Sequence, residues 1–201
     1  MKTITALLFL ALYTLSPFFS CYSSVVEKDN EVTTEEYAVY SAVIQTMFVK
    51  ESVKTIVVAK HTTFYDYKSS WEKPEDYLRV MLEQLRPLSP DTLEDFERKN
   101  NEQSELGLRL NLSLKYVLLD KQAPTNTPEA YAERWRSFYD QYPGSPGIIS
   151  LSRVGFNANK DQAIVYAANI CGGLCGKGYY VLLTMSGRGW KIEKDLMLWI
   201  S

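Results

Sequence analysis

Arg153 is the residue whose position most clearly calls for a chemical partner. It lies inside a run of β-forming residues that begins at Ile148, and it shares the two-residue period of Ile149 and Leu151. If that face packs on a core, the guanidinium is buried and needs a carboxylate or a ligand beside it. A buried ion pair and a ligand-binding arginine both fit this pattern.

Hydroxyl and aromatic side chains could complete a binding site around this arginine. Ser152 precedes it, and Tyr179 and Trp190 begin two later β-rich runs. We include these three with Arg153 as possible ligand-binding residues. Other aromatic residues could line a pocket, although packing in the core is the simpler explanation for most of them. They are Trp71, Trp135, Trp199 and the tyrosines between positions 131 and 142.

Nucleophilic catalysis has little support in the residue pattern. His61 is the only histidine, and a Ser-His-Asp mechanism would have to use it. Its place at the end of a short β-rich run is more typical of a surface or capping residue. The segment Gly144-Ser145-Pro146-Gly147 lacks the spacing and flanking elements of a nucleophile elbow. We therefore assign no catalytic residue.

Two further motifs have structural explanations. The run from Gly172 to Gly178 is one residue short of a phosphate-binding loop and has glycine where that loop needs Ser or Thr. Turn positions explain these glycines better. The acidic pair Glu75-Asp76 and the acidic cluster at 91–95 fall at expected helix starts, where the helix dipole stabilises carboxylates.

The three cysteines predict a disulfide and a modified third residue. They are Cys21, Cys171 and Cys175, an odd number that calls for an explanation in an exported chain. Lipidation of Cys21 leaves Cys171 and Cys175 to pair across a short loop as a structural disulfide. Free thiols, a redox pair and a metal site are alternatives. Redox motifs favour two intervening residues, and zinc needs four ligands, so we expect neither a metal nor a cofactor.

The N-terminus has the features of a secretory signal peptide. Lys2 supplies a positive charge, and an apolar run follows from Ile4 to Leu15, too short to span a bilayer. The segment 18–21 resembles a loose bacterial lipobox, which predicts lipid attachment at Cys21. Ordinary cleavage after Ser23 or Ser24 is the alternative. We expect residues 1–20 to be a signal peptide and the protein to lie in the periplasm or outer cell envelope.

Composition limits the classes of partner. The chain has 201 residues and a formal net charge of −2, with both signs interspersed and no basic stripe. Nucleic-acid binding is therefore not expected, because phosphate recognition needs clustered Lys and Arg. No apolar window after residue 21 is long enough to cross a membrane, so membrane contact is expected only through the lipid. We expect a polar tether at 21–33 and a single domain at 34–201.

Helix signals dominate the first two-thirds of this domain. Helices are expected from Thr34 as N-cap, from Pro74 to about Leu85, from Ser89-Pro90 to about Gln103, and from Thr127-Pro128 to about Tyr142. Residues 54–60 read as a buried strand. Leucines alternate with other residues from Leu106 to Leu118, which predicts one long strand over 106–119.

The last third of the chain is rich in β-formers and turns. Four strands are expected, joined by short connections that favour an antiparallel meander. They are 148–156, 162–170, 179–185 and 190–200. The expected fold class is α+β, with N-terminal helices packed on a mainly antiparallel sheet that ends in this four-stranded C-terminal meander.

The C-terminal stretch resembles an uncharacterised family of small bacterial exported proteins. The matching motifs are Ser152-Arg153-Val154-Gly155-Phe156-Asn157, Gln162-Ala163-Ile164-Val165-Tyr166, the run from Cys171 to Tyr180, and Leu198-Trp199-Ile200-Ser201. The likeness covers about the last 55 residues well, and the region from Trp135 to Gly144 more loosely. The resemblance implies a defined exported domain and no particular activity.

These patterns lead to two hypotheses of function. The first is an exported, lipid-anchored domain that serves binding or structure, with a protein or small molecule as its partner. The second is a hydrolase-like enzyme of the envelope that uses Arg153 and a carboxylate in an aromatic cleft. The position and partners of Arg153 in the fold discriminate between them.

Overall fold

The computed structural model describes residues 31–63, 80, 83–120 and 127–201. The expected signal peptide, Cys21, most of the tether, Trp71 and most of the helix expected from Pro74 lie outside these residues. The elements are α1 (Thr34–Met47), β1 (Ile56–Ala59), α3 (Pro90–Lys99), β2 (Tyr116–Leu119), α4 (Pro128–Gln141), β3 (Ile148–Leu151), β4 (Gly155–Phe156), β5 (Gln162–Gly172), β6 (Cys175–Ser186) and β7 (Gly189–Ile200).

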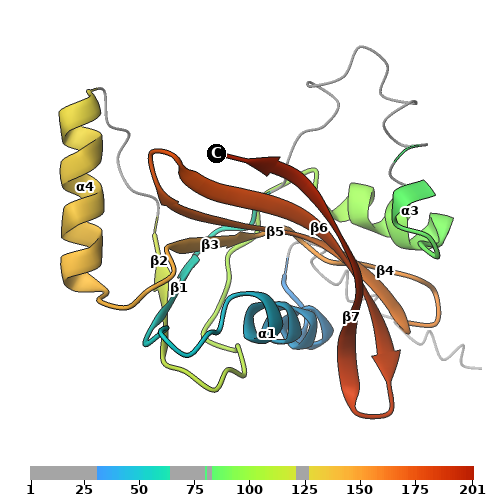
Figure 1. The fold of residues 1–201 in the computed structure, drawn as a ribbon. Helices are drawn as coiled ribbons and strands as arrows, with labels where there is room; N and C mark the ends of the chain where they lie inside the picture. Colours follow the sequence, from blue (N-terminus) through green and yellow to red (C-terminus); the bar gives the residue numbers. More distant parts are fainter. Residues whose placement is uncertain (1–30, 64–79, 81–82, 121–126) are drawn as a thin grey trace, which may run out of the picture.

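One mixed sheet organises these elements. Its strand order is β2-β1-β3-β5-β6-β7, and β4 pairs with β5 beside this path. Strand β1 runs parallel to both of its neighbours, β2 and β3. The other four pairs, β3–β5, β4–β5, β5–β6 and β6–β7, are antiparallel. Figure 1 shows α1 against the sheet, with α3 and α4 near its opposite ends. The expected α+β class and the C-terminal antiparallel run are therefore confirmed.

Each strand divides its side chains between two cores. Ile56 and Val58 of β1 pack with α1, while Val57 between them packs with Trp135 of α4. On β5, Val165 belongs to the α1 core and its neighbours belong to a second core with α3. This two-residue alternation is what a sheet covered on both faces requires.

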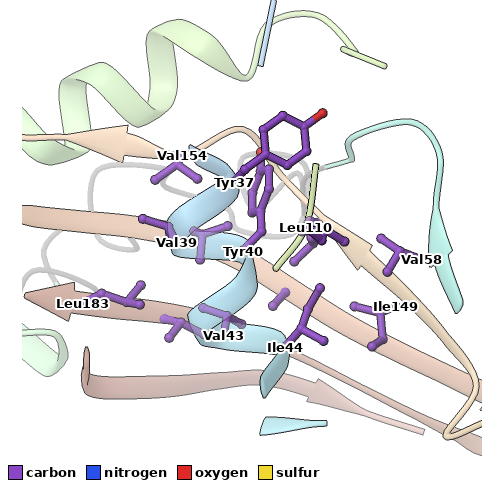
Figure 2. Close-up of a cluster of buried hydrophobic side chains, with 14 of the residues drawn as sticks. Tyr37, Val39, Tyr40, Val43, Ile44, Val58, Leu110, Ile149, Val154 and Leu183 are labelled. Atoms are coloured by element: carbon purple, nitrogen blue, oxygen red, sulfur yellow. The ribbon is translucent and has the colours of Figure 1, made fainter. Parts of the chain in front are cut away.

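Helix α1 supplies the centre of the largest core. Val39, Val43 and Ile44 have no exposed surface, and Figure 2 shows them packed among side chains of the sheet. The helix begins in a capping box, where Thr33 and Glu36 exchange hydrogen bonds between side chain and backbone. The N-cap is therefore Thr33, one residue before the position expected from the sequence.

The strand expected at 106–119 is wrong before Tyr116. The backbone N–H groups of Gly107, Asn111 and Ser113 donate to side chains one turn apart on α1, namely Tyr37, Ser41 and Gln45. These donors are consequently not used in a β-ladder. The leucine alternation also fails at Leu108, which is 76% exposed.

The first strand of the expected meander is divided into β3 and β4. Both pair with β5, and the interruption lies at Ser152, Arg153 and Val154. The hydroxyl of Ser152 accepts the hydrogen bond from Tyr166 N at 2.9 Å, and the N–H of Ser152 donates to Tyr166 O at 3.0 Å. A side chain thus replaces one ladder acceptor where the strand bends.

Candidate functional site

The side chain of Arg153 forms a buried ion pair with Glu36. Its Nε lies 2.8 Å from Oε1 of Glu36, and its Nη2 lies 3.1 Å from Oε2. The two residues are 2% and 0% exposed. This paired, two-bond geometry is the most favourable one for a guanidinium and a carboxylate. The partner required by the sequence pattern is therefore an acid at the start of α1.

The remaining hydrogen-bonding atoms of this pair are also occupied. Glu36 accepts from Thr33 N at 2.9 Å and from Val154 N at 3.0 Å. Arg153 donates to Ser104 Oγ at 3.0 Å and to the carbonyl of Glu31 at 3.2 Å. A buried charge is tolerated when it is paired and its polar atoms are hydrogen-bonded, and each side-chain nitrogen of Arg153 and each carboxylate oxygen of Glu36 makes at least one such bond.

Tyr40 and Ser152 extend this network toward the sheet. The hydroxyl of Tyr40 donates to Ser152 O at 2.8 Å, and the hydroxyl of Ser152 donates to Arg153 O at 2.8 Å. Complete burial raises the pKa of Tyr40 well above its ordinary value, and the negative charge of Glu36 adds to this effect. Tyr40 is thus a fixed neutral donor that holds the bend between β3 and β4.

The other possible ligand-binding residues lie apart from this network. Tyr179 is buried in the α1 core, and Trp190 packs on Phe156 with ring centroids 5.6 Å apart. Neither residue lines the cleft that Arg153 borders. The structure therefore groups Arg153 with Ser152 and does not bring Tyr179 or Trp190 to the same cavity.

A cleft of about 810 Å³ opens beside the ion pair. Its walls come from the start of α1, from α3, from Arg109 and from the turn between β4 and β5. Charged side chains of both signs dominate the lining. They are Glu31, Glu35, Asp91, Asp95, Arg98, Lys99, Arg109, Arg153 and Lys160.

Asp95 makes the contacts that join the α3 wall to the sheet. Its carboxylate pairs with Arg98 at 2.7 Å and Lys99 at 2.8 Å, and it accepts from Phe156 N at 2.8 Å. Partial burial raises the pKa of Asp95, but the hydrogen bonds from Lys99, Phe156 N and Arg98 outweigh it, so the pKa lies below its usual value. Asp95 therefore ties α3 to β4.

The β4–β5 turn forms the opposite rim. Ala158 N donates to Asp91 at 3.0 Å, and hydrogen bonds from Ser89 and this N–H lower the pKa of Asp91. The turn contains Lys160 with φ of 53°, a left-handed conformation in which glycine is the usual residue. Backbone outliers of this kind concentrate at functional positions.

The α1 wall combines an arginine with an acid. Arg109 donates to Thr34 Oγ1 at 2.6 Å and lies over the ring of Tyr37 at 4.9 Å. The pKa of Glu35 is lowered chiefly by its own backbone N–H, against the effect of burial, with further help from the positive charge of Lys160. Cationic and anionic groups thus meet at the mouth of the cleft.

The remaining chemical candidates lie elsewhere in the molecule. A disulfide joins Cys171 and Cys175 across the β5–β6 hairpin, as expected, and it indicates an oxidising, non-cytoplasmic compartment. His61 Nδ1 lies 3.7 Å from Asp120, away from the cleft lining. Among the described residues, no cluster of three or more His, Cys, Asp or Glu side chains could hold a metal ion.

Sequence reasoning missed the residues that shape the cleft. Neither Glu36 nor Lys160 is among the ligand-binding residues expected from the sequence. The available signals were the Thr33/Glu36 capping spacing and a lysine at a turn position where glycine is common. The cleft itself depends on four segments that only the fold brings together.

Over the part of the chain that the structure describes, no helix has both the length and the apolar character needed to cross a membrane.

Comparisons with known proteins found no relatives. No protein-family model matches the sequence, and neither the curated proteins nor the solved structures contain a match to it.

Proposed function

We propose that this chain is an exported binding domain whose charged cleft takes a small zwitterionic ligand, such as an amino acid or a short peptide. The observation that carries the proposal is the cleft of about 810 Å³ with both signs of charge in its walls. That volume lies in the range of small-molecule sites. We infer binding and no chemical step, because the arginine of the site is occupied by Glu36, Ser104 and Glu31 O.

Preorganisation of the walls supports this proposal. Asp95 is fixed by Lys99, Arg98 and a backbone N–H, and Arg109 is fixed by Thr34. Side chains that are already ordered lose little conformational entropy when a ligand arrives. The charges of the cleft are therefore arranged before binding.

The two signs at the mouth define the ligand class. Lys99 and Lys160 line the same cleft as Glu35, so cationic and anionic groups face one opening. A ligand that carries an ammonium and a carboxylate can contact both at once. A purely anionic ligand would meet Glu31, Glu35 and Asp91 at the same opening.

Nuclear magnetic resonance titration of the purified exported protein tests the proposal. Short zwitterionic peptides should shift the amide signals of residues 31–35, 95–99 and 156–160, with neutral sugars and inorganic phosphate as comparison ligands. Shifts confined to other surfaces, or equal shifts with all three ligand classes, would contradict the cleft as the site. Unchanged peptide signals over hours distinguish binding from turnover.

A hydrolase-like enzyme is the second candidate. The observation in its favour is that Arg153 borders the same cleft as Asp91 and Asp95. Against it, the aromatic part of the cleft is Phe156 alone, since no tyrosine or tryptophan among the described residues lines it. Consumption of a peptide or ester by the wild type, lost in Asp91→Asn, would favour this candidate over simple binding.

Export and a lipid on Cys21 complete the proposal. The disulfide supports an oxidising compartment, and the expected signal peptide and lipobox supply the route to it. Radiolabelled palmitate should mark the wild-type protein and leave Cys21→Ala unlabelled. The matched control is Cys175→Ser, which should keep the label. Equal labelling of Cys21→Ala would contradict the anchor.

A further inference from the structure

Helix α4 is attached to the bridged hairpin by two tyrosine hydroxyls. Tyr139 Oη donates to Cys171 O at 2.9 Å, and Tyr131 Oη donates to Gly172 O at 3.2 Å. Both acceptors belong to the short loop that the Cys171–Cys175 disulfide closes. The position of these carbonyls therefore depends on the shape of the bridged loop.

The hairpin has an irregular ladder at this point. The β5–β6 pairing shifts register between Ile170 and Gly172, so the ladder alone holds the loop weakly. The disulfide bridges the irregularity with the two Cα atoms 5.0 Å apart. Gly173 lies against Tyr131, since a Cβ at Gly173 would come within 3.4 Å of the ring. The loop and the first half of α4 thus fit each other closely.

Two other side chains of α4 supply its apolar attachment to the sheet. Trp135 and Phe138 are buried against Val57 in an aromatic and aliphatic cluster. Tyr131 and Tyr139 are only partly buried, and their hydroxyl bonds end on the hairpin. Release of the loop would break both hydroxyl bonds, and the Tyr131 end would loosen first, because the buried rings of Trp135 and Phe138 still hold the rest of the helix.

We propose that the Cys171–Cys175 disulfide is a redox-controlled latch that holds α4 against the β5–β6 hairpin through Tyr131 and Tyr139. Cys175 is exposed and Cys171 is half-buried, so a dithiol reductant can reach the bridge. One thiolate of the reductant attacks a sulfur of the bridge and forms a mixed disulfide. Its second thiol then resolves that disulfide, which leaves two cysteine thiols on this chain and the reductant oxidised.

This latch goes beyond the cleft, because it controls a surface at the other end of the sheet. Opening would expose the aromatic side of α4 near Tyr131 and Trp135, which pack together with centroids 6.4 Å apart. The cleft contains no residue of α4 or of the hairpin. Ligand binding in the cleft and release of α4 can therefore be measured separately.

Hydrogen exchange read by mass spectrometry tests the latch on the full exported chain. Dithiothreitol treatment of the wild type, and the Cys171→Ser/Cys175→Ser variant, should each speed amide exchange over residues 131–137 by about tenfold. Exchange in α1 should stay unchanged. Tyr131→Phe/Tyr139→Phe, which keeps the bridge, should reproduce most of the acceleration at 131–137.

Three results would overturn the latch. The first is unchanged exchange at 131–137 in the reduced protein. The second is equal acceleration in α1 and α4 without the bridge, because the disulfide would then support the whole fold and not this helix. The third is an intact mass that shows the bridge surviving millimolar dithiothreitol.

Discussion

Helices α1 and α4 both pack on the sheet, but their attachments use different chemistry. Helix α1 combines a large apolar core with the buried Glu36–Arg153 pair, whose polar atoms are hydrogen-bonded on every side. Helix α4 has a small aromatic cluster and two hydroxyl bonds to a hairpin loop. Figure 1 shows the corresponding difference in placement, with α1 against the centre of the sheet and α4 at its margin.

This difference indicates which helix can separate from the sheet without unfolding of the whole protein. Removing either partner of a buried ion pair strongly destabilises the fold, because the other charge is left in the protein interior without a counter-charge. The aromatic packing of α4 at the edge of the sheet loses stabilising free energy gradually, in proportion to the apolar area that becomes exposed. We therefore expect α1 to unfold only with the whole protein and α4 to open locally. The predictions below test this contrast, beginning with the largest effect.

Removal of the negative charge of Glu36 should cost the most stability. Glu36→Gln retains a capping side chain but leaves Arg153 buried without a counter-charge, which typically costs about 3–5 kcal/mol. Urea unfolding monitored by circular dichroism measures the loss. The double variant Glu36→Gln/Arg153→Met should be more stable than Glu36→Gln alone. Additive losses in the double variant would show that the charge is not the cause.

A change in the α4 cluster should have a smaller and local effect. Phe138→Leu removes ring contacts with Trp135 and Tyr142, at a cost of about 1–2 kcal/mol. Hydrogen exchange should accelerate in α4 and remain slow in the middle of α1. If both helices exchange faster to the same extent, α4 is part of the global unit and the contrast fails.

The rim of the cleft should give a pH-dependent effect. The folded-state pKa of Asp95 is lowered, so its contribution to stability is present above about pH 4 and is lost as the pH falls through the folded-state pKa. Asp95→Asn should cost about 1 kcal/mol at pH 7 and less at pH 2, where more of the Asp95 carboxylate is protonated. Unfolding curves at both pH values measure this.

The control for Asp95 is Glu133→Gln. Glu133 pairs with Arg136 at 2.7 Å on the exposed side of α4, where an ion pair contributes little. The free energy of unfolding of Glu133→Gln should match that of the wild type at pH 7 and at pH 2. A pH-independent loss in Asp95→Asn would mean that shape, and not charge, links α3 to β4.

Much of the fold follows from local sequence signals. Pro90 and Pro128 mark the first turns of α3 and α4, and the short turns of the last third give the antiparallel strands. The leucine alternation at 106–115 misleads because its backbone donors bond to side chains of α1 and not to a strand. The alternation correctly indicates the burial of Leu106 and Leu110, but it does not indicate that α1, and not a neighbouring strand, satisfies the backbone.

For the candidate site, too, the sequence predicts some features and not others. Strand parity predicts the burial of Arg153, since Ile149 and Leu151 are also fully buried. Its partner Glu36 is 117 positions away, and no local pattern links two residues so distant in sequence. The cysteine count predicts the Cys171–Cys175 bridge because only two neighbouring thiols need to be paired.

The smallest stability effect concerns Lys160, where stability and binding should move in opposite directions. Lys160→Gly removes the cost of a left-handed backbone at φ of 53°, for a gain of about 0.5 kcal/mol after the added flexibility of the unfolded chain. The same change removes a cation from the cleft and should weaken binding of a zwitterionic peptide about fivefold. Thermal unfolding and calorimetric titration measure the two effects.

Lys160→Ala separates these two causes, because it removes the ammonium and keeps the Cβ. It should weaken binding as much as Lys160→Gly does and bring no gain in stability. If both variants bind the peptide like the wild type, the strained turn serves the fold alone and the cleft does not use Lys160. If only Lys160→Gly weakens binding, the rigidity of the turn and not the charge is what the ligand requires.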